Sequence, residues 1–288
     1  MTGEPHERTV EIAGRTRRAL VFVPDEALTS PDERLPVVFA FHGGGSTAEG
    51  MIDFSGLAEK GETAGFVSVF PSGTGRVAEA LTWNGGNCCG RAMKDQVDDV
   101  DFVRRLIDHL DRWLPIDRDR IYATGMSNGG MMSYRLAAQL SDQIAAIAPV
   151  GGPIGCLECT PERPVPVCHF HGTRDEFAPY QGGIGRRSLS KTRFYSVEQS
   201  IETWVRANSC HATPVVEDLP ATNDDGTSVT RSIFGGGRNG SEVWLHTIHG
   251  GGHTWPGRAT TLQMLGPVTR NLHANDVMWE FFQRHRRG

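Results

Sequence analysis

One serine in the sequence has the surroundings of a catalytic nucleophile, with a glycine two residues before it and another two residues after it. Ser127 occupies the centre of the run Gly125-Met126-Ser127-Asn128-Gly129, after an apolar segment, 121–124, and before a helix-like segment, 131–138. A strand, a G-x-S-x-G turn and a helix form a nucleophile elbow, in which the tight turn exposes the serine hydroxyl and favours glycine on either side. We therefore predict that Ser127 is a nucleophile, with capping of the following helix as the alternative.

The partners of such a serine are expected later in the chain, first a carboxylate and then a histidine. Asp175 follows the apolar segment 165–170 and is the candidate orienting acid, with a turn or helix cap as its alternative role. His253 lies in a glycine-rich loop after the apolar segment 243–248 and is the candidate general base. The order Ser127, Asp175, His253 predicts acyl transfer through a covalent intermediate.

Backbone N–H groups that could hold an oxyanion are expected at two places. The apolar segment 36–41 runs into His42-Gly43-Gly44-Gly45, where Gly44, with Gly43 beside it, is expected to supply one donor. The N–H of Asn128, at the start of the predicted helix, is expected to supply the other. A flexible turn is the alternative explanation of the glycine run, and His42 and His171 are predicted to be structural.

Seven motifs make the chain resemble the polyhydroxybutyrate depolymerase family of esterases, which is close to the feruloyl and acetyl xylan esterases of the α/β-hydrolase superfamily. The resemblance implies a secreted-type serine esterase with its triad on Ser127, Asp175 and His253. The family usually has an export signal, and this sequence shows none. The motifs span nearly the whole chain: His42-Gly43-Gly44-Gly45, Trp83-Asn84, Cys88-Cys89, 97–100, 125–130, 171–175 and 251–257.

The elements that must position these residues alternate along the chain. A hairpin is predicted from 9–12 and 18–23, followed by strands at 37–41, 66–70, 121–124, 145–150, 165–170 and 243–248. Helical periodicity lies between them, most clearly at 100–110, 197–207 and 276–284. This rhythm predicts an α/β-hydrolase fold, with a mostly parallel central sheet and helices on both faces. The segment 180–196 is expected to be a mobile loop beside the pocket, and a large lid is not expected.

Composition favours a single catalytic domain over residues 1–288. Hydrophobic residues make up 38% and charged residues 22%, and no apolar run approaches the ~20 residues of a membrane span. The formal net charge of −5 and the lack of a Lys/Arg run argue against nucleic acid and anionic membranes as partners. The expected partner is a small-molecule or oligomeric ester, and the oligomeric state is left open.

Two further motifs are not expected to bind cofactors or metals. The run Gly235-Gly236-Gly237-Arg238-Asn239-Gly240 matches G-x-G-x-x-G, but a strand-like segment follows it, so we predict a hairpin turn. His246, His249 and His253 lack an acidic or cysteine ligand at the usual tight spacing for zinc. We therefore expect no cofactor and no metal, and chelators should not affect activity.

The six cysteines leave the location of the protein open. Residues 1–7 lack the apolar core of a signal peptide, which indicates the cytoplasm if the chain is complete. If a leader was removed, the protein is extracellular and disulfides are expected among the loop cysteines, with no connectivity assigned. Cys168 lies in an apolar segment. Cys156 and Cys159 have C-x-x-C spacing, but no second pair completes a zinc site.

The substrate is expected to be a feruloyl, aryl or short-chain ester. Trp83, Trp255 and Gly43 are predicted to contact it, the two indoles at the pocket mouth and with ordinary core packing as their alternative. Polyhydroxybutyrate or other polyester oligomers are the alternative substrates, and a non-catalytic binding protein is the alternative from a different class. Asp98 or Asp99 is predicted to cap the helix that begins at Val100 rather than to act in catalysis.

Overall fold

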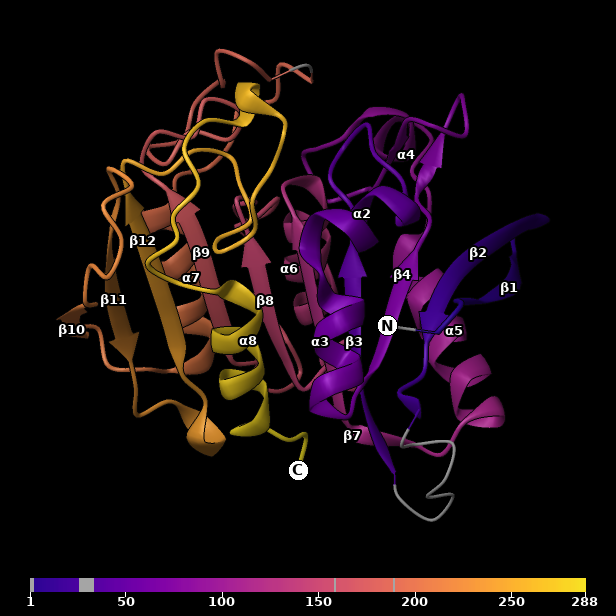
Figure 1. The fold of residues 1–288 in the computed structure, drawn as a ribbon. Helices are drawn as coiled ribbons and strands as arrows, with labels where there is room; N and C mark the ends of the chain where they lie inside the picture. Colours follow the sequence, from indigo (N-terminus) through magenta and orange to yellow (C-terminus); the bar gives the residue numbers. More distant parts are fainter. Residues whose placement is uncertain (1–2, 26–33, 158, 189) are drawn as a thin grey trace.

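A ten-stranded sheet forms the centre of the molecule (Figure 1). The computed structural model describes residues 3–25, 34–157, 159–188 and 190–288. Strands β4, β3, β7, β8, β9 and β12 run parallel, while the β1–β2, β2–β4, β12–β11 and β11–β10 pairs are antiparallel. In spatial order the strands are β1 (His6–Ile12), β2 (Arg15–Phe22), β4 (Val67–Pro71), β3 (Leu35–Phe41), β7 (Ile116–Met126), β8 (Ala146–Val150), β9 (Val167–Gly172), β12 (Val243–His249), β11 (Ser228–Phe234) and β10 (Val215–Asp218).

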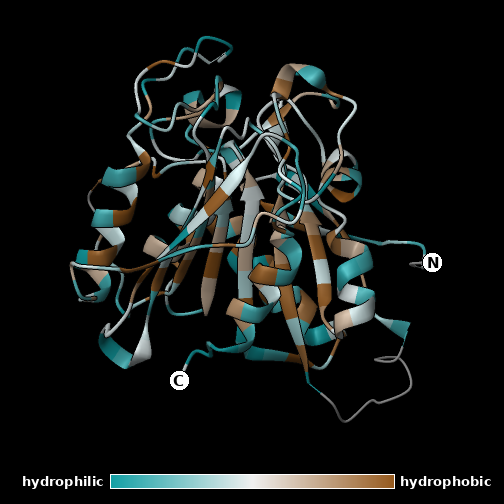
Figure 2. Cartoon of the chain, turned by 60° about the vertical axis from the view of Figure 1, so that its left-hand side comes forward, coloured by the Kyte–Doolittle hydropathy of each residue, from teal (hydrophilic) through white to brown (hydrophobic). Residues whose placement is uncertain are grey.

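Helices cover both faces of this sheet, because its central strands are apolar on both sides. In β3, Phe39 and Phe41 pack in one buried cluster, while Val38 and Ala40 pack in the other. Figure 2 shows the hydrophobic colour gathered in the central strands. None of the described helices combines the length and apolar character needed to cross a membrane. The first cluster includes α5 (Asp99–Trp113), α6 (Asn128–Gln139) and α7 (Val197–Asn208), and the second includes α2 (Ala48–Ser55), α3 (Leu57–Ala64) and α8 (Ala274–Gln283).

The predicted α/β-hydrolase architecture is confirmed, and the differences lie at the edges. The sequence analysis missed the edge strands β10 and β11, and also the small hairpin of β5 (Thr74–Gly75) and β6 (Leu81–Thr82). The glycine run 235–240 joins antiparallel β11 to β12 and contains the 3-10 turn η1 (Arg238–Gly240), so its prediction as a hairpin connection is confirmed. Asp98 caps α5 by accepting the N–H of Asp101 at 2.9 Å, as expected.

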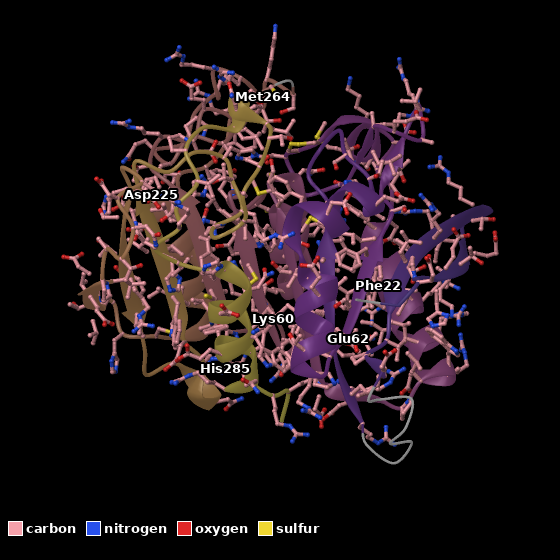
Figure 3. All side chains as sticks on the ribbon, viewed as in Figure 1. Phe22, Lys60, Glu62, Asp225, Met264 and His285 are labelled. Carbon is pink, nitrogen blue, oxygen red and sulfur yellow. A yellow bond between two sulfur atoms is a disulfide. The ribbon has the colours of Figure 1, made fainter. Side chains whose placement is uncertain are left out.

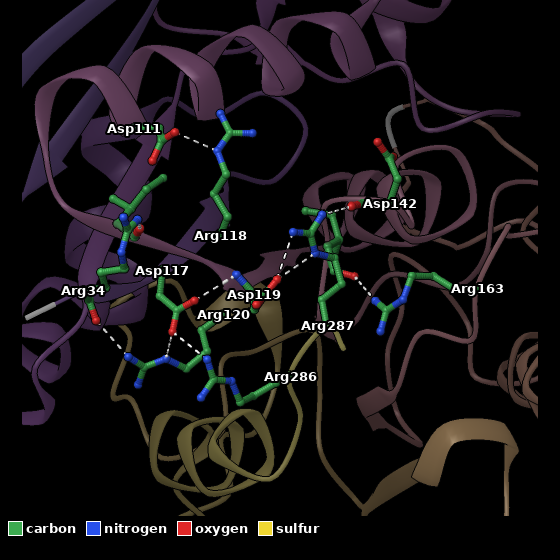
Figure 4. Close-up of polar contacts among 12 residues, drawn as sticks. Arg34, Asp111, Asp117, Arg118, Asp119, Arg120, Asp142, Arg163, Arg286 and Arg287 are labelled. Carbon is green, nitrogen blue, oxygen red and sulfur yellow. Dashed lines mark hydrogen bonds and ion pairs between the residues drawn. The ribbon is translucent and has the colours of Figure 1, made fainter.

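Ion pairs join the segment that follows α8 to the start of β7 (Figure 4). Arg286 pairs with Asp117 at 3.1 Å, and Arg287 pairs with Asp119 at 2.9 Å. Asp117 also accepts from Arg120 at 2.6 Å. These contacts lie at the amino ends of the parallel strands, the end opposite to the one where loops bring functional side chains together.

Candidate active site

Ser127 lies at a sharp turn between β7 and α6. Its backbone has φ 57° and ψ −117°, and its N–H donates to the carbonyl of Val150 at 2.8 Å. A positive φ is uncommon for a residue other than glycine, and such strained positions cluster at functional sites. A Cβ on Gly125 would lie 2.6 Å from the carbonyl oxygen of Phe41, and one on Gly129 would collide with the same oxygen. The turn therefore has the elbow geometry predicted from the G-x-S-x-G run.

Asp175 and His253 form a buried hydrogen-bonded pair. His253 Nδ1 lies 2.6 Å from Asp175 Oδ2, and the other carboxylate oxygen accepts the N–H groups of Phe177 and Ala178, each at 2.8 Å. Burial alone would raise the pKa of Asp175, but the facing His253 and hydrogen bonds from His171 and His253 hold that pKa well below its usual value. An ionised carboxylate requires a proton on His253 Nδ1, which leaves Nε2 free to accept one.

Ser127 and His253 line the same cavity. Within the part of the chain that the structure describes, no hydrogen bond joins the Ser127 hydroxyl to the imidazole. Such bonds are often long in a free enzyme and shorten when substrate binds. The structure thus brings all three predicted triad residues to one end of the sheet, with the acid–base contact already made.

A second, fully buried chain of hydrogen bonds reaches Asp175 from behind. His171 Nε2 lies 2.8 Å from the carbonyl of Ala178 and 3.4 Å from Asp175 Oδ2, so it must donate. With its Nε2 donating, His171 Nδ1 is the acceptor for His169 at 3.1 Å, and His169 in turn accepts from the Tyr134 hydroxyl at 3.0 Å. Burial lowers the pKa of His169, which favours the neutral ring that this direction requires. The predicted structural role of His171 agrees with these bonds.

The two predicted oxyanion donors lie next to each other. A Cβ on Gly44 would be 3.5 Å from the Cβ of Asn128, and both residues line the cavity together with Gly43. The Asn128 side chain accepts the Trp83 N–H at 2.7 Å and donates to the Trp83 carbonyl at 3.0 Å. Trp83 Nε1 donates to the carbonyl of His42 at 3.0 Å. Trp83 therefore links the glycine loop to the start of α6.

The prediction that Trp83 and Trp255 contact substrate is wrong. Their exposed fractions are 0% and 1%, and neither lines the cavity. The Trp255 indole donates to Asn275 at 2.8 Å and packs edge-on against Phe54. A large indole whose N–H finds an internal partner is stable in the core, and this was the alternative left open by the sequence. Both side chains support the cavity wall from behind.

The cavity has a volume of about 780 Å³ and a largely apolar lining. Its aromatic residues are Phe54, Phe177 and Phe194, and Phe177 stacks on the His253 ring at 4.9 Å. The sequence analysis missed these three, although Phe177 follows Asp175 by two residues. The segment 180–196 borders the cavity through Ser188, Ser190 and Phe194, as predicted.

Hydrophobic side chains extend to the surface near the cavity. Leu262, which lines it, is 51% exposed, and Met264 in the 3-10 turn η2 (Gln263–Leu265) is 53% exposed. Met264 is labelled near the upper end of the molecule in Figure 3. The site is thus accessible to a substrate with an apolar part.

A buried ion pair supports the loop that contains Trp83. Arg17 on β2 contacts Asp99 Oδ1 at 2.8 Å, and Asp99 Oδ2 accepts the N–H of Asn84 at 2.8 Å. The side chains of Arg17 and Asp99 are 6% and 0% exposed. Asp99 therefore holds the residue next to Trp83, and through it the donors at Gly44 and Asn128.

Cysteines and histidines give no sign of a metal centre in the described ranges. Cys88 and Cys89 form a disulfide with each other, and Cys89 lines the cavity. Cys168 is buried in β9. No group of three or more His, Cys, Asp or Glu side chains among the described residues could hold a metal ion.

Comparisons with known proteins identify esterases. No family model matches the chain. It is 33% identical to NocK of Nocardia uniformis subsp. tsuyamanensis, an inferred esterase, over 95% of this chain and 81% of that protein. It is 31% identical to feruloyl esterase B of Piromyces equi, over 77% of this chain and 40% of that protein. The acetyl xylan esterase of Aspergillus awamori superposes with a TM-score of 0.63 at 15% identity, over 96% of this chain and 99% of that structure.

Proposed function

The chain belongs to the α/β-hydrolase esterase family that includes feruloyl esterases, and from this premise we propose a serine esterase that acts through Ser127, His253 and Asp175. Ser127 attacks the ester carbonyl while His253 Nε2 takes its proton. The N–H groups of Gly44 and Asn128 hold the oxyanion. His253 then protonates the leaving alcohol, and water releases the acid by the same steps. The observation that carries this proposal is the 2.6 Å contact between His253 and Asp175, beside a strained serine in one cavity.

The favoured substrates are feruloyl, other aryl or short-chain esters. Phe54, Phe177 and Phe194 can stack against an aryl group, at about 0.5–1.5 kcal/mol for each good contact. Oligomers of polyhydroxybutyrate or another polyester are the alternative substrates, for which the apolar side chains of Leu262 and Met264 would provide contact. We propose that residues 1–288 act as one catalytic domain on small-molecule or oligomeric esters.

A panel of esters and amides tests this function. We expect the protein to hydrolyse methyl ferulate and p-nitrophenyl butyrate far faster than the matching amides or a crystalline polyhydroxybutyrate film. Phe177→Ala should reduce kcat/KM for methyl ferulate about 3- to 10-fold more than for p-nitrophenyl acetate, because only the ferulate has an aromatic ring in its acyl part. Trp255→Phe, a change behind the wall, serves as a control with no such selectivity. Rapid clearing of the film without ferulate hydrolysis would reverse the ranking.

The pH dependence should show a single acid limb. His253 must be neutral to accept a proton, whereas the lowered pKa of Asp175 keeps this carboxylate ionised throughout the mildly acidic range. A single general base gives kcat/KM one acid limb of unit slope, and Asp175 should add no second step. Because its folded pKa is lowered, ionised Asp175 also contributes stability that is fully present above the usual carboxyl pKa and is lost progressively as the pH falls from there to the lower folded value. A pH profile with an acid optimum would contradict the assignment of the base.

A further inference from the structure

Three cationic side chains line one side of the cavity. Arg76 belongs to the hairpin loop between β5 and β6, and Arg91 and Lys94 belong to α4 (Gly90–Lys94). All three are exposed. An adjoining groove shares Arg76 and Arg91 and adds Arg15 and Asp95, so three cations and one carboxylate line the surface next to the cavity.

This positive charge is only partly balanced nearby. No Asp or Glu of the described residues lines the cavity. Arg91 pairs with Asp95 at 2.5 Å, but in the described ranges Arg76 and Lys94 form no ion pair. The whole chain has a formal net charge of −5, so a positive cavity wall runs against the overall charge and is a local feature. Such a wall attracts anionic groups on small substrates.

The positive wall and His253 lie on opposite sides of Ser127. Ser127 follows β7, and the sheet order is β4-β3-β7-β8-β9-β12. The segment with Arg76, Arg91 and Lys94 follows β4, two strands to one side, whereas His253 follows β12, three strands to the other. Figure 1 shows α4 and the yellow segment after β12 on opposite sides of the upper strand ends. Because His253 protonates the leaving alcohol, the alcohol part lies on its side, and the acyl part extends towards the cations.

We propose that the site selects esters whose acyl part ends in a carboxylate, that is, monoesters of dicarboxylic acids, an inference that rests on the proposed esterase function. The apolar side chains of Met51, Phe54 and Val77 contact the methylene groups of the acyl chain. Arg76 and Lys94 bind the terminal carboxylate. Hydrolysis adds water across the single ester bond and releases the alcohol and the dicarboxylate.

Paired substrates test this selectivity. For chains of increasing length, kcat/KM is measured for the monomethyl esters of succinate, glutarate, adipate and suberate and for the neutral methyl ester of the same length. In Arg76→Gln and Lys94→Gln the anionic-to-neutral ratio should fall about 1.5- to 5-fold at low ionic strength, the size of a screened charge interaction. Added salt should lower the wild-type ratio in the same direction. Arg105→Gln, the same change on α5 away from the cavity, should keep the wild-type ratio.

Three results would overturn the inference in distinguishable ways. An unchanged ratio in both variants, with Ser127-dependent hydrolysis of the neutral esters, would refute the anionic selectivity and leave the esterase function intact. The ester 4-acetoxybutyrate has its carboxylate on the alcohol part, and butyl acetate is its neutral counterpart. If the variants lowered the anionic-to-neutral ratio more for this pair than for the dicarboxylic monoesters, the assignment to the acyl side would be refuted. Failure to hydrolyse any ester of either series would refute the esterase function and this inference with it.

Discussion

Replacing Ser127 by alanine is expected to lower kcat/KM for p-nitrophenyl acetate by about 10³-fold or more, and His253→Ala should have an effect of the same order. Without the Ser127 hydroxyl no acyl-enzyme forms, and without the imidazole no group takes its proton. Asp175→Asn should cost somewhat less, because the imidazole remains in place and loses only the carboxylate that fixes its tautomer and stabilises its charge. Initial rates under substrate saturation and at low substrate concentration would separate kcat from KM.

Controls make this result specific to the proposed roles. Ser232→Ala on β11 makes the same chemical change far along the sheet and should leave the rate close to that of the wild type. The double variant of Ser127 and His253 should be no worse than either single variant, because the two act as one unit. Activity retained in Ser127→Ala would show that another group is the nucleophile.

The largest expected effect on stability is at the buried pair of Asp99 and Arg17. Asp99→Ala should lower the free energy of unfolding by about 3–5 kcal/mol, because it leaves the Arg17 charge buried without its partner. It also removes the acceptor of the Asn84 N–H, and a donor left without a partner lowers the free energy of unfolding further. Urea unfolding followed by circular dichroism measures the change, and activity should fall as well, since Asn84 adjoins the Trp83 link to Asn128.

The neighbouring Asp98 provides a matched control for this prediction. Asp98→Ala removes an exposed carboxylate that caps the same helix, and it should cost only about 1 kcal/mol. Asp99→Asn keeps one acceptor oxygen and should lie between the two. Equal losses in Asp98→Ala and Asp99→Ala would show that Asp99 acts only at the helix end and does not support the loop.

Local patterns predicted most of the fold and the placement of Ser127, Asp175 and His253 at one end of the sheet. The elbow at Ser127 depends on a turn in which glycines are sterically required, so its sequence can be recognised without knowing the rest of the structure. The long apolar strands of the centre are equally clear. Edge strand β10 was missed because all of its residues, Val215–Asp218, are exposed, so its sequence shows no alternation of buried and exposed side chains.

Side-chain direction at the cavity was much harder to predict. Trp83 contacts Asn128, one of the two predicted oxyanion donors, through its backbone, yet its ring points into the core and donates to the backbone of His42. Phe177 lies on the cavity wall instead, because the turn after Asp175 directs it over His253. The sequence contains no periodic signal for either orientation, since both side chains lie in irregular loops whose paths depend on distant contacts.

Labelling with a serine-directed phosphonate, followed by mass spectrometry, tests the central claim most directly. The reagent forms a stable adduct with an activated serine, so its site identifies the nucleophile independently of the rate assay. We expect one adduct per chain, on the peptide that contains Ser127, formed in step with the loss of esterase activity and absent from Ser127→Ala. Complete inactivation with the adduct on another residue, or full activity after complete labelling of Ser127, would contradict the proposed mechanism.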